Sequence, residues 1–115
     1  MRTRNILLAS LLLVLYGCGP EVPKEYAAHA AEWELARETG CLMCHTTGKN
    51  LLGPAWESVS ERYRNNPDAE AYLMSKILNG GRGAWVESRD MPAYPEKLLA
   101  TENRKRLVDF LMSLK

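Results

Sequence analysis

Two cysteines and a histidine stand close together in the segment Cys41-Leu42-Met43-Cys44-His45. Thiols at this spacing can form thioether bonds to the two vinyl groups of one porphyrin, and the histidine that follows can bind the porphyrin iron. Two cysteines at this spacing also occur in thioredoxin-like dithiol sites and in half of a zinc site. However, the flanking sequence shows no βαβ context, and no Cys or His follows His45 to complete a zinc site. The motif therefore predicts covalent attachment of one haem c.

A second iron ligand is expected on the other face of the porphyrin, and Met91 is the best candidate. It precedes Pro92 in a loop, outside the helical periodicity that makes other methionines core residues. A thioether favours ferrous iron and raises the reduction potential, and the proline stiffens the backbone beside it. His29, the only other histidine, is expected on the surface of the first helix. We therefore predict His45 and Met91 as the two iron ligands.

Helical patterns on both sides of the motif are expected to position it. Residues 25–38 are rich in Ala, Glu, Leu and Arg, which favours a helix, and Gly40 is expected to end it. Residues 46–53 contain two glycines and predict a loop. Pro54 can then occupy the first turn of a second, short helix.

Two further helices are expected towards the C-terminus. Residues 66–68 (Asn-Pro-Asp) can begin a third helix, which Gly80 and Gly81 would end. Residues 81–95 show no period and predict a loop, and Thr101 can cap the last helix. The apolar stripe of that helix would be Leu107, Phe110, Leu111 and Leu114. No segment predicts a strand, so the predicted fold class is all-α.

The N-terminus has the pattern of a bacterial export signal. Two arginines precede an apolar run over residues 6–15, which is too short to span a bilayer. Residues 15–18 resemble a lipobox, in which Cys18 becomes the lipidated first residue of the mature protein. Tyr16 departs from the small residue usual at its position, so ordinary cleavage slightly further on is the alternative. We expect a signal over residues 1–17, a lipid-anchored spacer over residues 18–24, and one domain over residues 25–115.

Cysteine usage and charge agree with this division. Of three cysteines, two would hold haem and Cys18 would carry lipid, so no structural disulfide is expected. Removal of residues 1–17 takes away two arginines, which leaves 13 basic and 14 acidic side chains. This balance argues against nucleic acid as a partner and against strong electrostatic attachment to a membrane. The lipid would be the only tether of a monomeric protein.

Residues 34–115 resemble the short bacterial class I cytochromes c, the type that donates electrons to nitrite reductase. The resemblance implies a class I cytochrome c fold, with about four helices wrapped around one covalently attached haem. Its landmarks are Gly40-Cys41-x-x-Cys44-His45, Gly53-Pro54-Ala55, Lys76-Ile77-x-Asn79-Gly80, Gly83-x-Trp85, Met91-Pro92 and Leu107-Val108-x-Phe110-Leu111.

The resemblance also implies roles for residues around the haem. The carbonyl of Pro54 would accept a hydrogen bond from the second ring nitrogen of His45. The indole N–H of Trp85 would bond a haem propionate, with plain core packing as the alternative. Lys76 stands where an arginine often reaches a propionate, and a lysine can make only a point-charge contact there.

Two features depart from the family pattern. The segment between Trp85 and Met91 is one residue longer than in typical relatives. Tyr94 stands near the position of an asparagine that bonds the methionine sulfur, so its hydroxyl could make that contact instead.

In the family, the first and last helices cross, and Leu35 and Ala36 would meet the last helix.

These observations favour an electron carrier rather than an enzyme, because both axial positions of the iron would be filled. Two alternatives stay open. One is a haem enzyme or sensor in which Met91 is not bound and the sixth site is open. The other is a haem subunit of a larger dehydrogenase or reductase complex. A carrier would exchange electrons with redox proteins such as a cytochrome bc complex, nitrite reductase or a terminal oxidase. Export predicts a periplasmic location, and Gly19 after the lipid cysteine favours the outer membrane.

Overall fold

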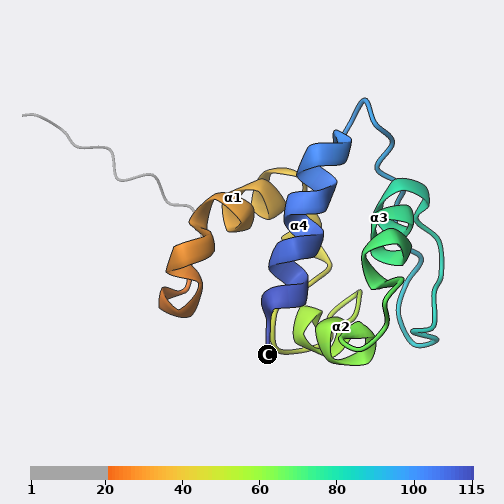
Figure 1. Cartoon of the computed structure of the whole chain (residues 1–115), viewed down its shortest axis with the longest axis horizontal. Coiled ribbons are helices and arrows are strands. Elements are labelled where there is room, and N and C mark those ends of the chain that lie inside the picture. The colour runs from red at the N-terminus through yellow and green to blue at the C-terminus, as the bar shows by residue number, and fades with distance from the viewer. Residues whose placement is uncertain (1–20) are drawn as a thin grey trace, which may run out of the picture.

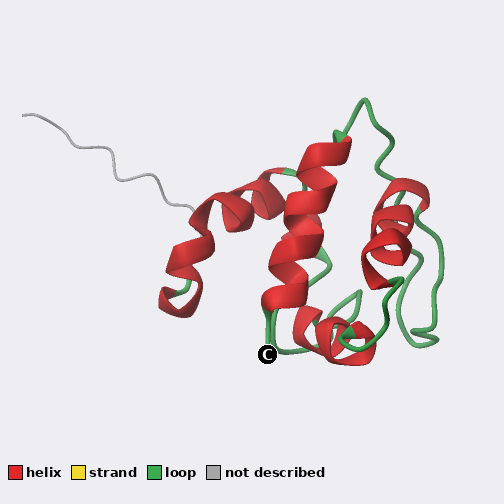
Figure 2. Cartoon of the chain, viewed as in Figure 1, coloured by secondary structure: helices red, strands yellow, loops and turns green. Residues whose placement is uncertain are grey.

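The computed structural model describes residues 21–115, so the predicted signal and Cys18 lie outside the described residues. Within residues 21–115, the regular elements are helices joined by loops (Figure 2), apart from one antiparallel bridge between Gly81 and Met91. The predicted all-α class is confirmed. In chain order the elements are η1 (Lys24–His29), α1 (Ala30–Glu38), η2 (Cys41–Met43), α2 (Trp56–Tyr63), α3 (Ala69–Asn79) and α4 (Thr101–Ser113), where η is a 3-10 helix.

Helix α4 is the centre of the arrangement and contacts each of the other three α-helices. In Figure 1, α1 crosses α4, α2 lies near its C-terminal end, and α3 stands on the far side from α1. The last helix therefore joins elements that are far apart in the chain. None of the helices between residues 21 and 115 is long and apolar enough to cross a membrane.

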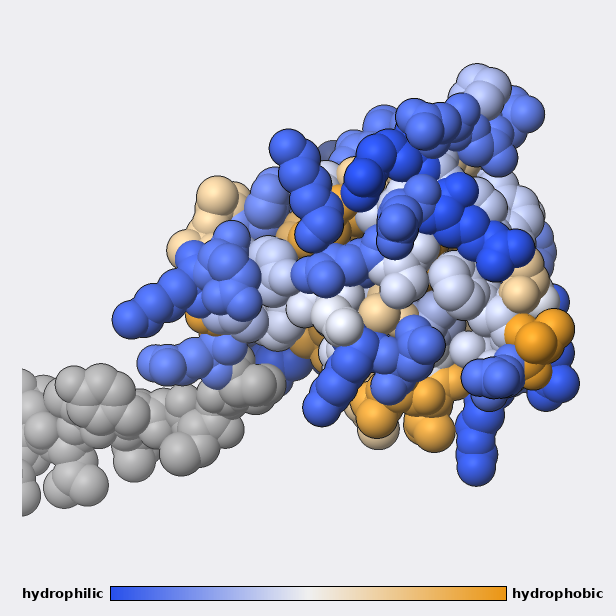
Figure 3. All heavy atoms as spheres, turned by 90° about the horizontal axis from the view of Figure 1, so that it is seen from below, coloured by the Kyte–Doolittle hydropathy of each residue, from blue (hydrophilic) through white to orange (hydrophobic). Residues whose placement is uncertain are grey.

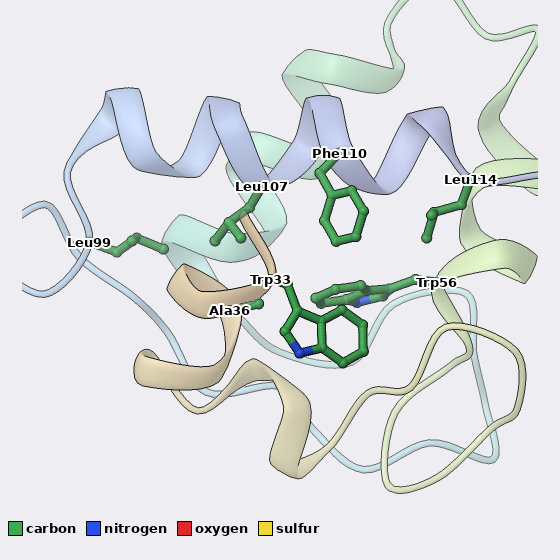
Figure 4. Packing of buried hydrophobic residues seen from close by; sticks show 7 residues of the cluster. All are labelled: Trp33, Ala36, Trp56, Leu99, Leu107, Phe110 and Leu114. Carbon is green, nitrogen blue, oxygen red and sulfur yellow. The ribbon is translucent and has the colours of Figure 1, made fainter. Parts of the chain in front are cut away.

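The main core lies between α1, α2 and α4 (Figure 4). Ala36 is fully buried and Leu35 packs against the same cluster, so α1 and α4 cross as predicted. The ring of Phe110 meets Trp56 edge to face, with centroids 6.0 Å apart, a geometry that aromatic pairs prefer. The buried members are Trp33, Ala36, Trp56, Leu99, Leu107, Phe110 and Leu114.

A second cluster joins α2, α3 and α4 through Val59, Leu73 and Val108. Ile77 and Leu111 are half-buried and pack against both clusters, so the apolar interior is continuous. Burial of these side chains removes apolar surface from water and stabilises the helix arrangement.

The first helical segment is interrupted, whereas a single helix was expected over residues 25–38. The 3-10 helix η1 forms first, and α1 starts only after His29, because the backbone of that residue (φ −117°, ψ 27°) departs from helical geometry. Tyr26 of η1 stacks on Trp33 with ring centroids 5.6 Å apart. Val22 also packs against the core, so packing begins before the predicted domain start.

Two residues near helix starts take places other than those predicted. Pro54 precedes α2 by two residues, and Thr101 is the first residue of α4, where Ala100 holds the N-cap position. The carboxylate of Glu96 accepts the Thr101 N–H (3.0 Å) and its hydroxyl (2.8 Å). The Glu96 carboxylate thus accepts a hydrogen bond from an N–H group at the start of α4, whereas Thr101 itself was expected to cap this helix.

Candidate functional site

The two cysteines and the histidine of the motif lie in a tight turn that follows α1. Gly40 has a left-handed backbone (φ 82°), which lets the chain turn away at the end of the helix. The N–H groups of Cys44 and His45 both donate to the carbonyl of Cys41, at 3.2 and 2.9 Å. Cys41, Cys44 and His45 thereby line one cavity of about 350 Å³. Neither thiol is in a disulfide, so both can form thioethers.

The imidazole of His45 is oriented by a residue close to it in sequence. Its Nδ1 lies 2.8 Å from the carbonyl oxygen of Pro54. Because a carbonyl can only accept, Nδ1 carries the proton and Nε2 keeps its lone pair. Burial lowers the pKa of His45, and the hydrogen bond to Pro54 opposes this effect. A neutral imidazole with a free Nε2 is the form that binds a metal ion.

Gly53 and Trp56 hold the plane of the same ring. A Cβ atom at Gly53 would lie 2.6 Å from Cε1 of His45, so the close approach requires glycine. Trp56 stacks on the imidazole with ring centroids 5.8 Å apart. The N–H of Gly53 donates to the carbonyl of Cys44 at 2.8 Å and closes the loop. Residues 41–56, which we call the proximal turn, thus hold His45 through contacts within one short segment.

Met91 lines the same cavity from residues 81–95, which we call the distal loop. Its N–H and carbonyl pair with those of Gly81, at 3.2 and 2.8 Å. Gly80 has a backbone (φ 64°, ψ −148°) that favours glycine, and a Cβ atom there would collide with the Met91 carbonyl. The N–H of Tyr94 donates to the carbonyl of Ile77 at 2.9 Å. Gly81 therefore holds the distal loop at Met91, and the C-terminal end of α3 holds it again at Tyr94.

The position of Tyr94 differs from the expected one. Its hydroxyl would lie 3.8 Å from a Cβ atom at Gly40, beside the proximal turn. Within the described residues it makes no hydrogen bond to the sulfur of Met91. The reason is packing, because the ring lies against the main core cluster and its backbone is tied to Ile77. Burial raises the pKa of Tyr94, so its hydroxyl stays protonated.

One end of the cavity combines aromatic and cationic side chains. Lys76 and Trp85 both line it, and Nζ of Lys76 donates to the carbonyl of Gly80 at 3.3 Å. The guanidinium carbon of Arg62 lies 5.0 Å from the ring centroid of Trp85, which is a cation–π contact. Cations and N–H groups at a cavity edge suit an anionic group, such as a haem propionate.

Three residues near this end were missed by sequence analysis. Tyr63 and Tyr72 line the cavity with ring centroids 5.1 Å apart, and Arg62 lies beside them. In the sequence, Tyr63 recurs at helical spacing with Trp56 and Val59, but that pattern indicates only the inward face of a helix. In the sequence, Arg62 has the pattern of an ordinary surface residue. Its contact with Trp85 joins α2 to the distal loop, and such a contact between distant segments leaves no local signal.

The residues that line the cavity fit a haem. All eight cofactor-binding residues predicted from the sequence lie along its wall, although they come from three separate parts of the chain: the proximal turn, α3 and the distal loop. Most of the remaining wall is apolar, as a porphyrin requires. The eight are Cys41, Cys44, His45, Pro54, Lys76, Trp85, Met91 and Tyr94. The apolar side chains are Leu52, Val59, Leu73, Ile77, Leu107, Val108 and Leu111.

Exposed apolar side chains occur beside the cavity mouth. Leu52 lines the cavity while 43% exposed, and its carbonyl accepts the N–H of Arg89, which joins the proximal turn to the distal loop. Figure 3 shows apolar side chains gathered along one margin of an otherwise polar face. We use the name apolar rim for four exposed apolar residues that line the cavity or adjoin a lining residue in the proximal turn and the distal loop: Met43, Leu51, Leu52 and Val86.

Comparison with known proteins places the chain in a family. The family model described as Cytochrome c matches residues 33–115. Cytochrome c2 of Rhodocyclus tenuis is 38% identical over 88 residues, which are 75% of this chain and 95% of that protein. Cytochrome c-552 of Hydrogenobacter thermophilus is 34% identical over 85 residues, covering 74% of this chain and 83% of the relative.

Solved structures agree with these sequence relatives. The crystal structure of cytochrome c552 from Nitrosomonas europaea superposes with a TM-score of 0.64 at 31% identity, covering 72% of this chain and 99% of that chain. The class 1 cytochrome MtoD from Sideroxydans lithotrophicus superposes with a TM-score of 0.62 at 32% identity, covering 72% of this chain and 91% of that chain.

Proposed function

The chain belongs to the cytochrome c family, whose members carry electrons on covalently bound haem c, and we propose that His45 and Met91 are its axial ligands. The observation that carries the proposal is that the motif cysteines, His45 and Met91 line one apolar cavity. Cys41 and Cys44 would hold the haem through thioether bonds. When bound, the haem supplies the one-electron redox change of its iron.

The protein's own groups are suited to a carrier. The hydrogen bond from His45 to Pro54 keeps Nε2 unprotonated, and Gly53 with Trp56 prevents rotation of the ring. A ligand held in this way needs no rearrangement when the iron changes oxidation state. A bound Met91 would close the second axial position to small molecules and favour the ferrous state. Lys76 and Trp85 would face the haem propionates.

An optical spectrum of the oxidised holoprotein tests the ligand assignment. The sulfur-to-iron charge-transfer band should be present in the unchanged protein and absent in Met91→Ala, because the alanine supplies no thioether. Met112→Ala is the matched control, since Met112 packs against the second core cluster, and that variant should keep the band. A missing band together with ready binding of carbon monoxide to the reduced protein would instead identify an open-site enzyme or sensor.

Electrons would leave through the apolar rim. Met43 and Val86 are 77% and 78% exposed, and the charged residues nearby have both signs: Lys49, Glu87 and Arg89. A small apolar contact of this kind suits a transient redox complex, which buries little surface and separates quickly. The proposed partners are redox proteins such as a cytochrome bc complex, nitrite reductase or a terminal oxidase.

We further propose a periplasmic protein held to a membrane by lipid on Cys18, after removal of residues 1–17. The basic start, the apolar run and the lipobox-like segment support this proposal. Cys18→Ser should move the holoprotein from the membrane fraction to the soluble periplasmic fraction. Retention of that variant in the membrane fraction would contradict lipid anchoring, and a separation of inner and outer membranes would locate the anchored form.

A further inference from the structure

Arg104 is a buried arginine in the first turns of α4. Only 4% of the residue is exposed, although its guanidinium is always charged. Removing such a charge from water is costly unless it is paired and hydrogen-bonded. The contacts of Arg104 therefore identify what the charge holds in place.

The guanidinium binds the segment that leads from the distal loop into α4. Its Nη1 donates to the carbonyl oxygens of Tyr94 and Leu99, at 3.2 and 3.0 Å. Its Nη2 donates to the Glu96 carboxylate at 2.6 Å and to the Thr101 hydroxyl at 2.7 Å. One side chain thus gathers four oxygen atoms from residues 94–101, a segment that Figure 1 shows as the connection into α4.

The contact with Tyr94 lies three residues after Met91. The N–H of Tyr94 is bound to Ile77 and its carbonyl is bound to Arg104, so both sides of this peptide segment are held. Met91 itself pairs with Gly81. Without Arg104, the distal loop would keep its contacts with α3 but would lose the hydrogen bond that ties the Tyr94 carbonyl to α4.

We propose that Arg104 is a positioning residue for Met91, which clamps the C-terminal side of the distal loop against α4 and keeps the thioether in place. This inference rests on the proposed function, because it requires Met91 to be the iron ligand. The clamp contacts neither the haem nor Met91 itself. It acts by favouring the closed arrangement of the loop over an open one in which Met91 is released.

Imidazole added to the oxidised holoprotein measures this equilibrium. It can occupy the second axial position only when Met91 has left, so its apparent affinity is proportional to the fraction of open loop. Arg104→Gln removes charge-assisted hydrogen bonds that are made only in the closed form. We expect the affinity for imidazole to rise about tenfold or more and the charge-transfer band to weaken.

Arg106→Gln is the matched control. Arg106 lies on the same helix and is also hydrogen-bonded, but its partners are Glu32 of α1, at 3.1 Å, and Asn103. Its loss should lower overall stability while leaving imidazole affinity within about twofold of the unchanged protein, because it does not contact the distal loop. Glu96→Gln leaves both carbonyl contacts of Arg104 available and should raise the affinity only a few-fold. This variant gives a result even if Arg104→Gln does not fold.

The outcomes separate the two proposals. The clamp is supported if imidazole affinity rises in Arg104→Gln, or rises less in Glu96→Gln, while it does not change in Arg106→Gln. The clamp is overturned if imidazole affinity rises equally in Arg104→Gln and Arg106→Gln. It is also overturned if the affinity rises in neither Arg104→Gln nor Glu96→Gln. In both cases the proposed function stands. A missing charge-transfer band in the unchanged protein overturns the ligand assignment, and the clamp with it.

Discussion

The proximal turn and the distal loop line the same cavity, but they are held by different kinds of contact. In the proximal turn, the partners of His45 are residues 53–56, all within eleven positions of it in the chain. In the distal loop, Met91 depends on the C-terminal end of α3 and, through Tyr94, on Arg104 of α4. Because the contacts of His45 are local in sequence, the proximal turn can form with little help from the rest of the fold. The distal loop requires the helices to be assembled first, and it is therefore expected to open first.

The largest effect is expected from Gly53→Ala in the proximal turn. The added methyl group would lie 2.6 Å from Cε1 of His45 and would have to displace the imidazole. We expect a loss of about 3 kcal/mol in the free energy of unfolding, measured by urea denaturation of the holoprotein. Gly48→Ala is the control, because its nearest neighbouring atom is 3.6 Å away. An equal loss in the free energy of unfolding of the two variants would show that the contact between Gly53 and His45 has no special role.

Gly80→Ala should affect the distal loop alone and sharpen the contrast. The backbone conformation there disfavours a side chain, and the Cβ atom would meet the carbonyl of Met91, at a cost of about 2 kcal/mol. The charge-transfer band should be lost while the haem stays attached and His45 stays bound. Gly83→Ala is the control in the same loop, because its backbone is not left-handed and the nearest atom to its Cβ lies 3.4 Å away, so this variant should keep the band. If Gly80→Ala keeps it too, the loop is not held in the way described.

Arg62→Gln should have a smaller effect, at the cation–aromatic end that joins α2 to the distal loop. An exposed cation–π contact with Trp85 contributes about 0.5–1 kcal/mol, which urea denaturation should detect. Removal of a positive charge near the haem should also lower the reduction potential in a potentiometric titration. Arg64→Gln is the control, because Arg64 contacts the carbonyl of Leu114 instead. A lower potential in both variants would assign the change to net charge alone.

The smallest effect should appear in acid, at the clamp. The hydrogen bonds from the Thr101 backbone and hydroxyl, followed by Arg104, hold the pKa of Glu96 below its ordinary value of 4.5. A depressed pKa in the folded protein stabilises it above pH 4.5, and this contribution is lost as the pH falls through the folded value. The charge-transfer band of the oxidised holoprotein should therefore weaken below pH 4.5, and Glu96→Gln should show a smaller loss. Identical pH profiles for the two proteins would exclude Glu96 as the titrating group.

Parts of the molecule that depend on neighbours in sequence could be predicted well. Gly40 and Gly80 end helices as expected, and Pro54 lies beside His45 although it is not in the first turn of α2. The single helix expected over residues 25–38 was wrong, because Tyr26 packs back on Trp33 and η1 forms instead. Residue type alone does not reveal a contact between side chains seven positions apart.

Contacts between distant segments could not be predicted from the pattern. The sequence allowed a contact between the Tyr94 hydroxyl and the sulfur of Met91, whereas in the fold the ring packs against the core and the hydroxyl lies near Gly40. Arg104 has the sequence pattern of a surface residue in a charged helix start, yet it is among the most buried residues of α4. Arg62 lies on Trp85 only because α2 and the distal loop meet.

The sequence by itself determined the haem attachment motif, the identity of both candidate ligands and the all-α class. These depend on residue type, short spacing and helical period, which are properties of the chain. The tertiary structure alone decided which charge is buried, where Tyr94 lies and what holds the distal loop. The physical reason is that desolvation and packing depend on which distant groups surround a side chain. Arg104 illustrates this, because only the folded chain shows that its charge is buried and bound to residues 94–101.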